Sequence, residues 1–115
     1  MKTDIQTSII SWLTMRLRAD LSSKHTKVWL FGSVASNEFP FGDCDLLVVY
    51  DRHSLQSILR IIKAWKRDFR RDFSLNLHVT SLTNEEFKEG IPLIETIFQK
   101  PNRKLFPTHT KGDEQ

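Results

Sequence analysis

Four residues, two on each side of a short connecting segment, have the types and spacing that phosphate chemistry requires. Gly32 and Ser33 follow one apolar stretch, and Asp43 and Asp45 begin another. A glycine lets the backbone approach a ligand closely, and a serine hydroxyl beside backbone N–H groups at a helix start suits a phosphate. Two carboxylates two residues apart on a strand share one face and are hard ligands for Mg²⁺, which also binds triphosphate oxygens. These residues therefore predict a site that aligns an in-line attack on phosphorus.

Each of these residues also has a purely structural interpretation. Asp43 can be a turn residue after Gly42, Asp45 a capping or edge carboxylate, and Ser33 an ordinary helix N-cap. A carboxylate inside an otherwise apolar strand is costly, however, unless another group pairs with it. We therefore favour the functional interpretation for the two aspartates.

Two strands are expected to position these residues. Lys27–Phe31 is short, β-branched and aromatic, and Cys44–Tyr50 is apolar enough to lie near the centre of a sheet. Between them, Ser33–Asn37 predicts one helical turn, and Glu38–Gly42 is a loop because Pro40 breaks either period.

The rest of the chain predicts three further helical regions and one more strand. The strand is Ser74–Thr80, in which apolar and polar residues alternate. The helical regions share apolar positions that repeat every three or four residues. They cover about 4–21, 54–69 and a last region that Thr83 and Glu86 open as a capping box and that Gly90 and Pro92 divide. The order α-β-α-β-α-β-α predicts an α/β (α+β) fold, with one small mixed sheet flanked by helices.

The length and composition indicate one domain, which we expect to span residues 1–99, with 100–115 as a flexible tail. The single cysteine, Cys44, excludes an internal disulfide and a cysteine-rich zinc site. No apolar run approaches the roughly 20 residues that span a bilayer, and the N-terminal segment lacks the continuous apolar stretch of a signal peptide. We therefore expect a cytoplasmic protein without membrane contacts.

A cluster of basic residues lies within the predicted helix 54–69 and just beyond it. Its ordinary interpretation is the solvated face of an amphipathic helix, and the alternative is a surface for phosphates or an acidic partner. The cluster comprises Arg60, Lys63, Lys66, Arg67, Arg70 and Arg71.

The residues from Gly32 to Tyr50 resemble the nucleotidyltransferase superfamily that includes DNA polymerase beta, and especially its minimal nucleotidyltransferases. The resemblance lies in Gly32-Ser33, the spacer 34–42, and Asp43-Cys44-Asp45 followed by an aliphatic strand. It covers residues 28–50 by motif and 1–99 by element order. It implies the nucleotidyltransferase fold, nucleotide binding by Gly32 and Ser33, and catalytic, metal-binding roles for Asp43 and Asp45.

This sequence departs from the family pattern at two places. The spacer is one residue shorter than usual. The family's third carboxylate is expected on the next strand, where His78 takes its place at the start of the matching run His78–Thr83. A neutral imidazole can act as a ligand or a base, although it cannot offset the charge of two divalent ions. The alternative for His78 is a polar residue that lines the site.

The resemblance implies a Mg²⁺-dependent enzyme that transfers NMP from ATP or another NTP to a hydroxyl of a partner. Minimal nucleotidyltransferases are often encoded beside a HEPN-domain toxin, so an antitoxin-like role with a protein acceptor is implied. The first alternative is a catalytically degenerate binding or regulatory subunit, which His78 favours. A weaker alternative is nucleic-acid binding or modification through the basic cluster. An apolar face on the first or last helix could also support a homo- or hetero-oligomer.

Overall fold

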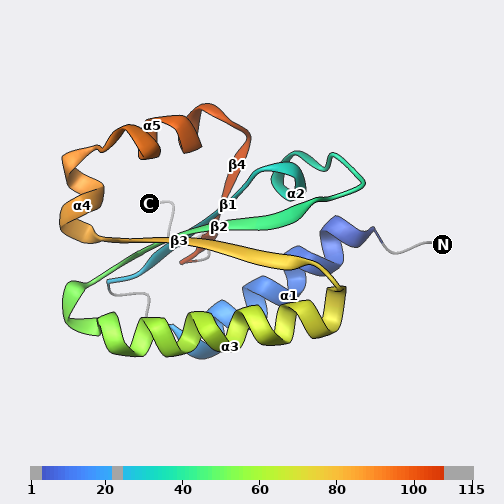
Figure 1. Ribbon diagram of the computed structural model, residues 1–115, viewed down its shortest axis with the longest axis horizontal. Coiled ribbons are helices and arrows are strands. Elements are labelled where there is room, and N and C mark those ends of the chain that lie inside the picture. The colour runs from blue at the N-terminus through green and yellow to red at the C-terminus, as the bar shows by residue number, and fades with distance from the viewer. Residues whose placement is uncertain (1–3, 22–24, 108–115) are drawn as a thin grey trace, which may run out of the picture.

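The computed structural model describes residues 4–21 and 25–107 and folds them into one four-stranded sheet with helices on both faces (Figure 1). Its elements follow in chain order as α1 (Ile5–Asp20), β1 (Lys27–Phe31), α2 (Ser33–Ser36), β2 (Asp43–Tyr50), η1 (Arg52–Ser54), α3 (Leu55–Phe73), β3 (Asn76–Thr83), α4 (Asn84–Glu89), α5 (Pro92–Gln99) and β4 (Asn102–Phe106).

The sheet is mixed, as predicted. Its strand order is β3-β2-β1-β4, and β1 pairs antiparallel with both β2 and β4. β2 and β3 are parallel, because the long helix α3 carries the chain back to the end of the sheet from which β2 started. The starts of β2 and β3 therefore lie side by side.

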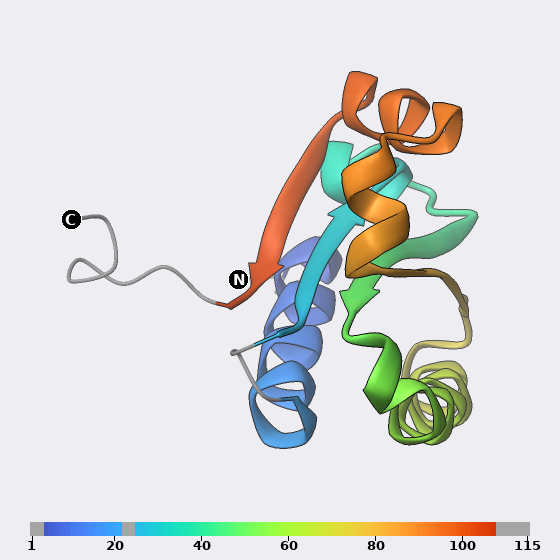
Figure 2. The ribbon, with the colours of Figure 1, turned by 90° about the vertical axis from the view of Figure 1, so that its left-hand side faces the viewer.

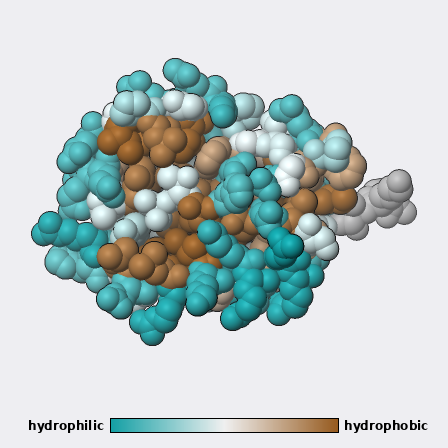
Figure 3. Space-filling view, viewed as in Figure 1, coloured by the Kyte–Doolittle hydropathy of each residue, from teal (hydrophilic) through white to brown (hydrophobic). Residues whose placement is uncertain are grey.

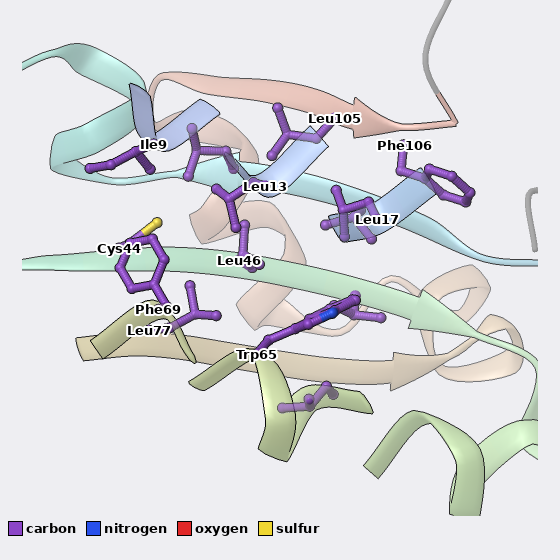
Figure 4. Packing of buried hydrophobic residues seen from close by; sticks show 14 of the residues in the cluster. Ile9, Leu13, Leu17, Cys44, Leu46, Trp65, Phe69, Leu77, Leu105 and Phe106 are labelled. Carbon is purple, nitrogen blue, oxygen red and sulfur yellow. The ribbon is translucent and has the colours of Figure 1, made fainter. Parts of the chain in front are cut away.

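One face of the sheet packs against α1 and α3, which lie next to each other beneath it (Figure 2). The apolar side of α1 contributes Ile9, Leu13 and Leu17, and α3 contributes the buried rings of Trp65 and Phe69 (Figure 4). Alternate residues of β2 point into this layer, and they are Cys44, Leu46, Val48 and Tyr50. This face holds the larger part of the core.

The opposite face is covered by the short helices α4 and α5. Leu47 and Val49 of β2 pack there against Ile94 and Ile97 of α5. The capping box predicted at Thr83 opens α4, and Gly90 separates α4 from α5, also as predicted; the structure shows Gly90 in the left-handed conformation. Because strand residues alternate between faces, Asp43 and Asp45 belong to the same face as Leu47 and Val49.

The prediction of a flexible tail over residues 100–115 is wrong for Asn102–Phe106, which form the edge strand β4. Leu105 and Phe106 are only 4% and 5% exposed, and β4 hydrogen-bonds to β1, which would otherwise be an open edge. Its five residues lack a regular alternation, so no sequence pattern marked them as a strand. Residues 108–115 lie outside the described part of the chain.

Two predicted boundaries also shift. The helix predicted to end near Phe69 continues to Phe73, and the strand predicted over Ser74–Thr80 runs from Asn76 to Thr83. Ser74 adopts the left-handed conformation, with φ 55°, and its N–H caps the helix instead of entering the strand.

None of the helices in the described part of the chain has the length and apolar character needed to cross a membrane.

Candidate active site

Gly32 lies at the junction of β1 and α2, where its backbone takes an unusual conformation. Its φ of 81° and ψ of −156° fall in a region that is essentially limited to glycine. A Cβ atom at this position would lie 2.5 Å from Oδ2 of Asp45. Gly32 is therefore required twice, by the chain turn and by the close approach of a carboxylate.

Asp43 and Asp45 are the first and third residues of β2 and project from the same face. Their side chains are 36% and 27% exposed, so both reach solvent from a partly enclosed position. Asp45 pairs with Phe31 across the antiparallel strands, which places it beside Gly32. The Ser33 hydroxyl donates a hydrogen bond of 3.4 Å to the backbone carbonyl of Asp43 and links α2 to the start of β2.

His78 joins the two carboxylates from β3. The parallel register pairs His78 with Asp45, and its Nδ1 lies 3.6 Å from Oδ2 of Asp43 and 3.7 Å from Oδ1 of Asp45. Its side chain is 62% exposed and accessible to an incoming group. Five residues that are up to 46 positions apart in the sequence thus lie at one end of one face of the sheet. They are Gly32, Ser33, Asp43, Asp45 and His78.

The electrostatic environment distinguishes Asp45 from an ordinary surface aspartate. Partial burial raises the pKa of Asp45, His78 acts to lower it, Asp43 raises it further and Lys100 lowers it. Lys100 follows α5 and was expected in a flexible tail, so its place near the site was missed. Only the return of β4 to the sheet brings it there.

Cys44 lies between the two aspartates but belongs to the opposite face. It is fully buried, and burial, followed by the nearby Asp45 charge, raises the pKa of its thiol to about 12. The thiol is therefore protonated at neutral pH and packs in the core. Cys44 is neither a nucleophile nor a metal ligand in this arrangement.

The donor set suits a metal ion that is shared with a phosphate ligand. Among the described residues, no group of three or more His, Cys, Asp or Glu side chains is arranged to hold a metal ion. Mg²⁺ is commonly bound by one or two carboxylates, with substrate phosphates and water completing its shell. The Asp43/Asp45 pair fits that mode, because it supplies hard oxygen ligands and leaves other positions to the phosphates.

Comparisons with known proteins identify the family of the domain. The family model described as "Nucleotidyltransferase domain" matches residues 14–104. A crystal structure named as a toxin–antitoxin with AMP-PNP matches with a TM-score of 0.52 and 15% identity, over 96% of this chain and 78% of that chain. A Sulfolobus solfataricus protein, provisionally named a nucleotidyltransferase, matches with a TM-score of 0.49 and 18% identity, over 73% of this chain and 75% of that chain. No curated protein matched.

Proposed function

Because this chain belongs to the nucleotidyltransferase domain family, we propose that it transfers NMP from ATP or another NTP to a hydroxyl of a partner protein and releases pyrophosphate. The observation that supports this most strongly is the convergence of Asp43, Asp45 and His78 beside Gly32 at one end of the sheet. A bound metal ion there would neutralise phosphate charge.

In this proposal each residue of the site has a distinct role. Asp43 and Asp45 would hold a Mg²⁺ ion, and Gly32 leaves the space that Asp45 occupies. Ser33 and the neighbouring backbone N–H groups bind the triphosphate, because they lie at the turn that faces the carboxylates. His78 accepts the proton of the attacking hydroxyl, since it is exposed and adjacent to both carboxylates.

The partner is proposed to be a protein, such as a HEPN-domain toxin, which this chain would neutralise as an antitoxin. The name of the structure that covers 96% of this chain describes a toxin–antitoxin with AMP-PNP. That name supports both the partner class and an adenine nucleotide as the donor. At 15% identity the likeness itself shows only the fold.

A second function is favoured by one specific observation. The site has two carboxylates, and the third position holds the imidazole of His78. A site with less negative charge holds a metal ion, and the triphosphate bound through that ion, more weakly, so a binding subunit that regulates its partner without catalysis is the competing proposal.

Transfer of label tests the proposed reaction directly. We expect ATP labelled at the α-phosphate to label the protein encoded by the adjacent gene in the presence of Mg²⁺, whereas ATP labelled at the γ-phosphate does not. This contrast separates nucleotidyl transfer from phosphoryl transfer. Absence of transfer and of AMP-PNP binding, together with tight partner binding by Asp45→Ala, would instead establish the binding subunit.

Substitution of His78 tests its role as the base. We expect His78→Ala to lower kcat by about 100-fold, the lower end of the usual contribution of a general base, with little change in KM for ATP. His78→Asp restores the family's acid and should retain most of the activity. His53→Ala is the matched control, because His53 is exposed in η1 at the opposite end of β2. An unchanged rate in His78→Ala would reduce His78 to a residue that lines the site.

A further inference from the structure

The exposed side of α3 carries six cations, here called the basic face: Arg60, Lys63, Lys66, Arg67, Arg70 and Arg71. At 3.6 residues per turn they fall within a sector of roughly 140° around the helix axis. The core residues Trp65 and Phe69 lie on the other side of the helix. Figure 3 shows hydrophilic side chains gathered over α3 along the lower edge of the molecule.

Part of this charge is neutralised within the fold. The buried carboxylate of Asp68 forms ion pairs with three arginines, at N···O distances of 2.9 Å for Arg16, 3.0 Å for Arg67 and 3.4 Å for Arg71. Arg71 also contacts Asp72 at 3.0 Å. The Arg16–Asp68 pair joins α1 to α3, and the pairs within α3 leave Arg67 and Arg71 with carboxylate partners of their own.

The remaining cations have no such partner. Arg60, Lys63 and Lys66 form no hydrogen bond or ion pair with any residue in 4–21 or 25–107. Arg70 donates to the side-chain oxygen of Asn76 in β3 and has no carboxylate partner in the same ranges. Like charges along one helix side repel each other, so this uncompensated row is complementary to an acidic surface.

The same side of α3 also exposes two large apolar residues. Leu55 is 43% exposed and Leu59 is 53% exposed, and both lie beside the row of unpaired cations. Nucleic-acid backbones present mainly charged phosphates and offer little apolar surface for two leucines, and the aromatic residues Trp65 and Phe69 are buried, so they cannot stack on bases. Leucines flanked by cations suit a protein segment with apolar and acidic residues.

The basic face lies on the side of the sheet opposite the candidate active site, but its end near Arg70 reaches the edge strand β3. Its last unpaired cation, Arg70, contacts Asn76, and Asn76 pairs with Asp43 in the parallel register of β3 and β2. A segment bound along α3 would therefore lie next to the edge of the sheet that carries His78.

We propose that Leu55, Leu59 and the uncompensated cations Arg60, Lys63, Lys66 and Arg70 bind an acidic, leucine-bearing segment of a partner protein and hold that protein near the active site. The proposal rests on the proposed function only in identifying the bound protein as the acceptor. Binding itself requires neither nucleotide nor metal ion, so it can be tested separately.

Fluorescence anisotropy with three labelled probes tests this surface. The probes are a helical peptide of leucine and glutamate, the same peptide with serine for every leucine, and a short RNA duplex. The test variant carries Arg60→Glu, Lys63→Glu and Lys66→Glu. The control carries Arg18→Glu, Lys27→Glu and Lys88→Glu, which change the net charge equally at exposed positions on other elements.

We expect the leucine–glutamate peptide to bind the wild type and the control equally, and the test variant at least about tenfold more weakly. Leu55→Ser with Leu59→Ser, or the serine peptide, should also weaken binding severalfold. Asp45→Asn should leave peptide binding unchanged, so failure of transfer and failure of docking are distinguishable. Tighter binding of the RNA duplex without an effect of the leucines, equal loss in the control, or no peptide binding by the wild type would each overturn the proposal.

Discussion

Asp45→Asn is expected to slow nucleotidyl transfer strongly while leaving the fold at least as stable as the wild type. The amide removes the negative charge that would hold the metal ion, yet it keeps the size and shape of the side chain. A metal ion contributes several kcal/mol of charge stabilisation, and about 1.4 kcal/mol corresponds to a tenfold rate change. We therefore expect the transfer rate to fall by on the order of 1,000-fold.

The stability of Asp45→Asn follows from the raised pKa of the carboxyl. Partial burial raises the pKa of Asp45 in the folded state above its ordinary value, although His78 and Lys100 oppose the shift. The folded protein then holds the proton more tightly than the unfolded chain, so stability falls as pH rises from the ordinary aspartate range through the raised value. The asparagine variant lacks this pH-dependent loss of stability. Urea unfolding at several pH values measures the difference in the free energy of unfolding between the two proteins.

Asp51→Asn is the matched control for this prediction. Asp51 lies at the opposite end of β2, so its substitution makes the same carboxylate-to-amide change away from the site. Its side chain caps η1 by accepting a hydrogen bond from the N–H of His53. Asparagine is also a good cap, so activity and stability should both stay close to the wild type. Equal loss of transfer in both variants would show that general charge, and not this site, supports the reaction.

Gly32→Ala is expected to damage both stability and activity. Alanine is strained at φ 81° and ψ −156°, which costs about 1–3 kcal/mol of folding free energy. Its Cβ would also lie 2.5 Å from Oδ2 of Asp45, so the carboxylate must move. A displacement of about 1 Å at a reacting centre can cost about 100-fold in rate, and we expect a loss of at least that size.

Gly90→Ala separates these two effects. Gly90 also has a positive φ, of 66°, but nothing lies within 4 Å of the position where its Cβ would be. It should lose about 1–2 kcal/mol of stability through backbone strain and keep its transfer rate below its unfolding temperature. Thermal unfolding and label transfer, measured side by side, distinguish the variants. An active Gly32→Ala protein would mean that the contact with Asp45 has no functional importance.

Much of the fold follows from local sequence. β1, the capping box at Thr83 and the break at Gly90 lie where the pattern predicted them, because each depends on neighbouring residues alone. The family and the mixed sheet were also predicted correctly, since two apolar strands framed an uncommon pair of motifs. β4 was missed because it is stabilised by hydrogen bonds to β1, which is distant in the chain.

The sequence by itself determined the chemistry that the chain can offer. A glycine, a serine and two aspartates at fixed spacing specify which groups share a strand face, because side-chain alternation is a local property. Tertiary structure decided which other groups meet them, and among these His78 was expected only because the sequence resembles the nucleotidyltransferase family. The parallel register brought His78 to Asp45, the packing of β1 against β2 set Gly32 against that carboxylate, and the return of the chain through β4 placed Lys100 nearby. Pairing between strands and the burial that raises the pKa of Asp45 depend on residues far apart in the chain, and no local pattern contains that information.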